Sequence, residues 1–184
     1  MRTPLRLLTL VAVLAAAIVF PATASAVTPG TFTQPGFNSA NAPSGTHLAT
    51  ASATPTCTVD ANLNISCNSY TLQGVGHTNA TLNLVATYNE TVSCTNGGNN
   101  TVVAQQKTAS AGPTTVTPSN KNGSMTVPAT GVTAPVKGST SKGSPCPNRN
   151  WTATVLDVTL HSFTYTLTFD GFSSPAVEIT ATDP

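Results

Sequence analysis

The stretch from Trp151 to Phe169 constrains the fold of this chain more than any other segment. In its second half, Phe163, Tyr165, Leu167 and Phe169 alternate with serine and threonine. Successive side chains of a β-strand point to opposite faces of a sheet, so a period of two predicts a strand with one buried face. We therefore expect this stretch to lie at the centre of a β-structure.

The first half of the stretch is less regular, because its apolar residues change parity: Trp151, Ala153 and Val155, and then Leu156, Val158 and Leu160. One extra residue near Val155-Leu156 would return both sets to the same face, which predicts a β-bulge there. At His161-Ser162 the sequence allows either a hairpin or a bend in one long strand.

The composition supports an all-β chain. Only 7% of the 184 residues are charged, against about 25% in an average globular domain. Threonine, serine, asparagine, glycine and proline take their place, and this mixture favours strands and turns over helices. The formal net charge is only +1, so there is no basic surface of the kind that binds nucleic acid.

Three segments follow from the order of these features. Residues 1–26 have the pattern of a signal peptide: Arg2 and Arg6, the apolar run from Leu7 to Phe20, and a small-residue site at Ala24-Ser25-Ala26. The mature chain is then expected to begin at Val27, without a membrane span, because fourteen apolar residues fall short of the roughly 20 required. Residues 27–54 are rich in Pro, Gly, Ser and Thr and predict a flexible spacer. Residues 55–184 form the expected domain.

The four cysteines predict two disulfides in an exported chain. A three-residue loop, Ala61-Asn62-Leu63, would place Cys57 opposite Cys67 in a hairpin. Of the three possible pairings, this one leaves Cys94 to pair with Cys146. A zinc site would require closely spaced cysteines, such as Cys-x-x-Cys, and none occurs.

Further strands and turns complete an expected Ig-like antiparallel sandwich of about seven to nine strands. Alternation from Ala80 to Tyr88 predicts a strand, and Thr95-Asn96-Gly97-Gly98-Asn99 predicts a hairpin turn. Lys121-Asn122-Gly123 predicts a second turn. Residues 128–145 are rich in Pro, Gly, Ser and Lys and predict a long exposed loop.

Three of these motifs together resemble small exported proteins of actinobacterial genomes: Cys94 to Asn99, Lys121 to Gly123, and Cys146-Pro147-Asn148-Arg149-Asn150-Trp151. This resemblance covers roughly Cys57 to the C-terminus and implies secretion and a β-sandwich, with no assigned activity. The spacing from Cys57 to Cys67 is also similar to one bridge of the neocarzinostatin-type carrier proteins, which are secreted Ig-like sandwiches. The second closely spaced cysteine pair of that family is missing here.

No catalytic, cofactor or metal site is expected. Asp157 and His161 are four residues apart and could share one strand face, but no Gly-x-Ser-x-Gly element accompanies them. The aromatic residues Trp151, Tyr70 and Tyr88 are the candidate ligand contacts. For Trp151 the alternative is packing beside Cys94–Cys146, as in immunoglobulin domains.

The sequence thus predicts a secreted, non-enzymatic module with an adhesive or structural role at or near the cell surface. Its expected partner is an extracellular protein or a glycan. One alternative is a small-ligand or carbohydrate-binding protein. Another is a protease inhibitor that presents residues 145–149, the loop before Trp151.

Overall fold

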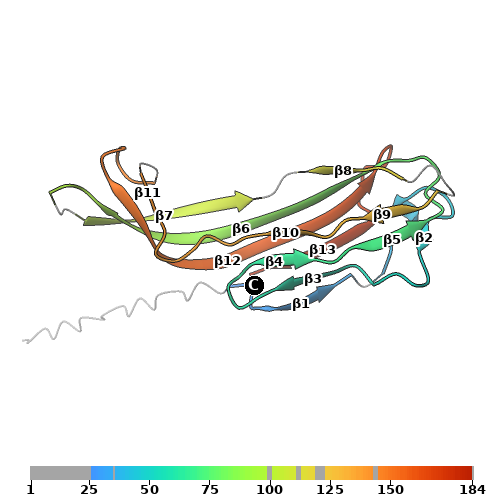
Figure 1. Ribbon diagram of the computed structural model, residues 1–184, viewed down its shortest axis with the longest axis horizontal. Coiled ribbons are helices and arrows are strands. Elements are labelled where there is room, and N and C mark those ends of the chain that lie inside the picture. The colour runs from blue at the N-terminus through green and yellow to red at the C-terminus, as the bar shows by residue number, and fades with distance from the viewer. Residues whose placement is uncertain are drawn as a thin grey trace, which may run out of the picture.

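The computed structural model describes residues 26–34, 36–98, 101–110, 113–118, 123–142 and 145–183. Across these residues the chain is all-β, with thirteen strands and one short 3-10 helix, η1 (Ser39–Asn41). Every strand pairing is antiparallel, and the strands form three sheets (Figure 1). The expected all-β, disulfide-bonded architecture is confirmed, although the strands outnumber the expected seven to nine.

The largest sheet is built around two long strands, β6 (Ala80–Thr95) and β12 (Thr152–Phe169). They pair along their whole length, from Thr95 opposite Thr152 to Ala80 opposite Phe169. Four shorter strands extend this sheet: β11 (Thr140–Lys142) and β13 (Val177–Thr182) on β12, and β7 (Thr101–Ser110) and β8 (Thr114–Val116) on β6. Strict alternation of buried and half-buried residues along β6 explains why it forms one strand.

Two irregularities interrupt the pairing of β12 with β6. The register shifts between Val155 and Asp157, which confirms the predicted bulge, and again between Leu160 and Ser162. Because β12 runs unbroken from Thr152 to Phe169, His161-Ser162 lies within one continuous strand and does not form a hairpin. Because each bulge adds one residue, side chains of opposite sequence parity reach the same core, and both Leu160 and Phe163 are buried.

Two smaller sheets form the second layer. One contains β1 (Gly30–Thr33), β3 (Thr56–Val59), β4 (Ile65–Cys67) and β10 (Thr130–Val132), and the other contains β2 (His47–Leu48), β5 (Tyr70–Gln73) and β9 (Met125–Val127). The main hydrophobic core lies between this layer and the large sheet, and it joins residues such as Leu72, Met125 and Phe163. The ring of Phe32 meets that of Phe163 edge-on, with centroids 5.2 Å apart.

The large sheet continues beyond the second layer and gives the molecule its elongated shape (Figure 1). We call this projecting part the arm, and define it as the described residues within 91–104 and 135–157. It has its own small apolar cluster of Val92, Cys94, Cys146 and Ala153, against which Ala104 and Trp151 pack. Glu90 is buried at the border between this cluster and the main core.

The expected spacer at residues 27–54 is wrong, because this segment is part of the sandwich. Strand β1 pairs with β3, strand β2 pairs with β5, and both Val27 and Ala42 are buried. Strands of four and two residues are too short to show a recognisable period, and their partners are distant in sequence. The folded domain therefore begins well before residue 55.

The expected exposed loop at residues 128–145 is also corrected. It contains β10 and β11, and it buries Val132 and Ala134. The predicted hairpin after Cys94 has its strands in place, with Thr95 paired to Thr101, although Asn99 lies outside the described residues. Lys121 and Asn122 of the second predicted turn also lie outside them.

Candidate functional site

Both predicted disulfides are present, Cys57–Cys67 and Cys94–Cys146. The first links directly paired residues of β3 and β4, as expected for a hairpin. The second links β6 to the segment before β12 and lies in the arm cluster. No cysteine remains free, so none can serve as a thiol nucleophile.

Tyr70 and Tyr88 are wrong as candidate ligand contacts, because both side chains are buried. The Tyr165 hydroxyl donates a hydrogen bond to the Tyr70 oxygen at 3.2 Å, and the Tyr88 hydroxyl donates one to the Leu63 carbonyl at 3.0 Å. Burial raises the pKa of Tyr88 to about 12 and that of Tyr165 to about 12, and raises the pKa of Tyr70 further. These tyrosines are core residues whose hydroxyl groups form hydrogen bonds within the protein.

Trp151 is half-buried and packs against the cluster around Cys94–Cys146. This is the packing alternative expected for it. Its backbone N–H closes a turn by donating to the Asn148 carbonyl at 3.1 Å, and the Asn150 N–H donates to the Asn148 side chain at 2.9 Å. The segment before Trp151 is thus an exposed closed turn, which differs from the extended strand that peptide-binding clefts commonly accept.

Asp157 and His161 are not brought together as a catalytic pair. Asp157 forms an ion pair with Lys137 at 3.1 Å, while Nδ1 of His161 lies 3.8 Å from Oδ2 of Asp183. The shift of register at His161 upsets the simple parity that suggested a shared face. Among the described residues, no group of three or more His, Cys, Asp or Glu side chains could hold a metal ion.

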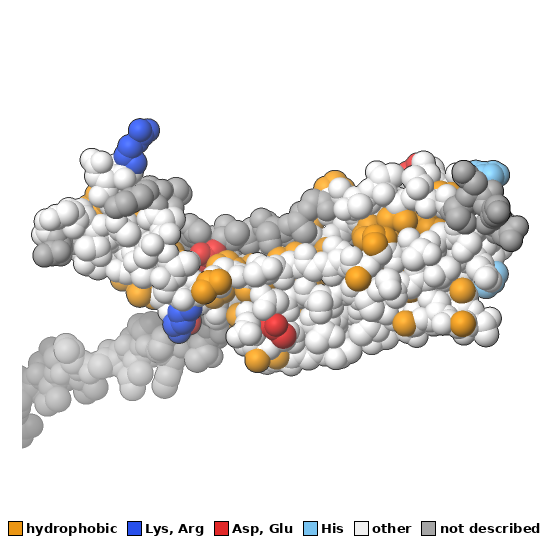
Figure 2. Space-filling view, in the orientation of Figure 1, with side chains coloured by type: hydrophobic (Ala, Val, Ile, Leu, Met, Phe, Trp, Pro, Cys, Tyr) orange, Lys and Arg blue, Asp and Glu red, His pale blue; other side chains and the backbone are white. Residues whose placement is uncertain are grey.

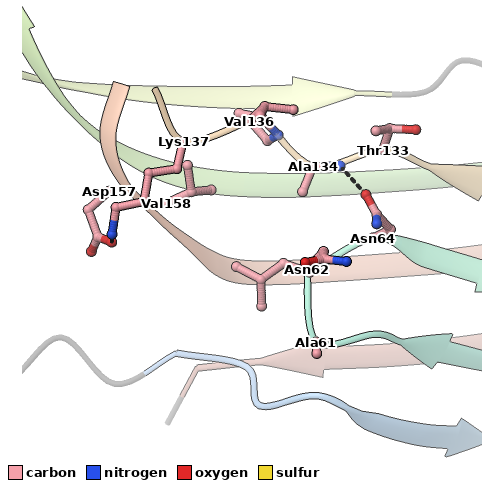
Figure 3. Close-up of a pocket in the computed structure, with 11 residues that line it drawn as sticks. Ala61, Asn62, Asn64, Thr133, Ala134, Val136, Lys137, Asp157 and Val158 are labelled. Atoms are coloured by element: carbon pink, nitrogen blue, oxygen red, sulfur yellow. Dashed lines mark hydrogen bonds and ion pairs between the residues drawn. The ribbon is translucent and has the colours of Figure 1, made fainter. Parts of the chain in front are cut away.

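A pocket of about 570 Å³ lies where the arm leaves the sandwich. Three segments that are distant in sequence line it: residues 61–64, residues 133–137 and residues 157–158. In Figure 3, Lys137 and Asp157 lie at one end and Asn62 and Asn64 at the other. Sequence reasoning missed this pocket, because no local pattern brings these segments together.

The loop between β3 and β4 forms one wall of the pocket and is held by Asp60. The Asp60 carboxylate accepts hydrogen bonds from the Asn62 N–H at 2.8 Å, the Asn64 N–H at 2.9 Å and the Asn64 side-chain amide at 2.9 Å. These bonds, with that from the Asn64 side chain the largest, lower the pKa of Asp60. Leu63 takes a left-handed conformation with φ 64°, as a tight turn demands.

Asn64 also joins two walls of the pocket, because its Oδ1 accepts a hydrogen bond from the Ala134 N–H at 3.0 Å (Figure 3). The lining combines apolar surface from Leu63, Pro135, Val136 and Val158 with the Asn62 amide and the Lys137–Asp157 pair. Such a mixture suits non-covalent binding of a ligand that has both apolar and polar groups.

A second feature concerns the surface of the arm. The described residues include four exposed large hydrophobic side chains, and all four lie on the arm: Val102, Val103, Val136 and Leu156. Val103 and Val136 are 64% and 65% exposed. Figure 2 shows few charged side chains on the visible face, and it also shows a group of hydrophobic side chains on the sandwich.

Fold and site together define a class of protein: an all-β, disulfide-bonded sandwich with a projecting sheet and a pocket at its base. Comparisons with protein-family models, curated proteins and solved structures found no match. Among the residues that the structure describes, no helix is long and apolar enough to span a membrane.

Proposed function

We propose that this protein is an extracellular, non-enzymatic module that acts by adhesion, binding a protein or glycan at or near the cell surface through its arm. The observation that carries the proposal is that, among the residues the structure describes, the exposed large hydrophobic side chains all lie on the arm. Exposed apolar side chains that gather on one part of a protein can mark an interaction surface.

The shape and chemistry of the molecule support this role. The arm projects from a sandwich that has its own core (Figure 1), so a partner can contact the arm without disturbing that core. Two disulfides are consistent with an oxidising, extracellular location, and the signal-peptide pattern of residues 1–26 agrees with secretion. An immunoglobulin-like relationship of the sandwich stays a prediction.

A second candidate function is binding of a small ligand or a carbohydrate. It is favoured by the pocket, whose volume of about 570 Å³ falls in the range of ligand sites, about 300–1,000 Å³. The third candidate, a protease inhibitor, is favoured less, because the segment before Trp151 is a closed turn.

A binding assay with labelled mature protein separates the first two candidates. Binding is measured to intact cells of the producing strain and to polysaccharide isolated from their envelope. The double variant Val102→Ser/Val103→Ser tests the arm, Asn62→Ala tests the pocket, and Thr126→Ser on the exposed face of β9 is the matched control.

We expect the arm variant to weaken binding by at least about tenfold, equivalent to about 1.4 kcal/mol, and the other two variants to bind normally. Loss of binding only in Asn62→Ala would favour the pocket and the second candidate. Normal binding by the arm variant would contradict the proposed role of the arm.

A further inference from the structure

Two backbone hydrogen bonds bring the expected mature N-terminus beside the C-terminal end of β13. The Val27 N–H donates to the Leu160 carbonyl at 2.9 Å, and the Asp183 N–H donates to the next carbonyl, that of His161, also at 2.9 Å. Figure 1 likewise shows the C-terminus beside the start of the described chain. Val27 and Asp183 therefore occupy neighbouring positions along the edge of β12.

Asp183 has a buried oxygen atom without a hydrogen-bond partner. Its side chain is 12% exposed, and its Oδ1 is buried and unpartnered. Its other oxygen, Oδ2, lies 3.8 Å from the His161 ring. A buried acceptor without a donor destabilises a fold, and more strongly when the group is charged, so a hydrogen-bond donor at this position would stabilise the protein.

Removal of a signal peptide would create such a donor. Hydrolysis of the Ala26–Val27 peptide bond by a signal peptidase consumes one water, leaving a carboxylate on Ala26 and an α-ammonium on Val27. The ammonium group has three N–H donors, and only one is used by Leu160. Val27 is 6% exposed in the uncleaved chain, and a nearby anion would stabilise the new charge wherever it stays shielded from water.

We propose that Asp183 is the acceptor for the α-ammonium group of Val27. Processing after Ala26 would then allow an ion pair that holds the N-terminus beside the C-terminal strand. Cleavage then stabilises both groups, because the buried carboxylate gains a hydrogen-bond donor and the ammonium gains a counter-ion. The proposal rests on the expected cleavage site and is independent of the proposed adhesive function.

The test compares two chains that differ only at the N-terminus: one begins at Val27, and the other begins at Ser25 and so keeps two native residues. Each is made with Asp183 and with Asp183→Asn, and their unfolding equilibrium constants are measured in denaturant. We expect the chain that begins at Val27 to have an unfolding constant about tenfold lower, or about 1.4 kcal/mol. With Asp183→Asn this advantage should disappear, whereas with His161→Gln it should remain.

Equal stability of the two chains would overturn the proposal, and so would an advantage that survives Asp183→Asn. If the Asp183→Asn chains do not fold, a crystal structure of the unaltered chain beginning at Val27 decides. Its α-nitrogen should lie within about 4 Å of an Asp183 carboxylate oxygen, the limit for an ion pair, and a longer separation would refute the proposal. N-terminal sequencing of secreted protein that gave a first residue other than Val27 would refute it as well.

Discussion

At Gly131 in β10, a single added methyl group would collide with the neighbouring strand. A Cβ atom there would lie 2.7 Å from the Ile65 carbonyl oxygen of β4, and the other nearest atoms also belong to the β4 backbone, which cannot turn aside as a flexible side chain can. We expect Gly131→Ala to lower the free energy of unfolding by about 1–3 kcal/mol, the range that overpacking costs when backbone must shift. Denaturant titration measures this change.

Gly36→Ala is the matched control, because a Cβ atom at Gly36 would meet nothing within 4 Å. It should leave stability within about 0.5 kcal/mol of the unaltered protein. If Gly131→Ala also left the free energy of unfolding unchanged, this would contradict the close approach of β10 to β4.

At the scale of elements, the two disulfides belong to different cores. Cys57 and Cys67 lie in the main core, whereas Cys94 and Cys146 lie in the small arm cluster. Chain-entropy estimates give the longer Cys94–Cys146 loop about 4 kcal/mol and the shorter one about 2.8 kcal/mol. By loop length alone, the Cys94–Cys146 disulfide should therefore stabilise the protein more than the Cys57–Cys67 disulfide does.

The structure predicts that the double variant Cys94→Ser/Cys146→Ser loosens the arm and leaves the sandwich folded. Hydrogen exchange should accelerate at residues 91–95 and 152–157, while residues 82–86 and 163–167 stay protected, because local opening follows local packing. Replacing Cys57 and Cys67 with serine should instead weaken the main core. Uniform acceleration in the arm variant would show that arm and sandwich unfold as one unit.

At the scale of the whole molecule, all three tyrosines lie in the main core. Burial raises their pKa values above the ordinary value of about 10, to about 12 for Tyr88 and Tyr165. A group whose pKa is raised in the folded state stabilises that state fully below its unfolded pKa, and this contribution is lost as the pH rises through its folded pKa. The tyrosines should therefore contribute a constant amount to the free energy of unfolding up to about pH 10. This contribution should fall between about pH 10 and 12.

Near-ultraviolet absorbance of tyrosinate measures this directly. In the native protein we expect no tyrosine to ionise near pH 10, with the signal appearing only as the fold is lost, whereas in denaturant all three should ionise near pH 10. Ionisation of even one tyrosine near pH 10 in the folded protein would contradict the burial of that residue.

Features that depend on a local pattern could be predicted from the sequence. Alternation predicted the buried face of residues 163–169 and the bulge at Val155-Leu156, because a period of two and its interruption are written in consecutive residues. The short loop between Cys57 and Cys67 predicted their pairing for the same reason, and elimination then gave Cys94–Cys146.

The accessibility of side chains and the contacts between distant segments could not be predicted in this way, because they depend on the three-dimensional arrangement of the strands. The sequence shows that Tyr70 and Tyr88 are aromatic but does not show what surrounds them, and in the structure both are buried. Residues 27–54 and 128–145 look like linkers because their strands are too short to show a period, and only pairing with remote partners orders them.

The pocket brings together residues near 62, 135 and 157. Val27 and Asp183 lie near each other because their N–H groups donate to two consecutive carbonyls of β12. Such contacts follow from how strands stack and pair across the chain, and no local pattern encodes that arrangement.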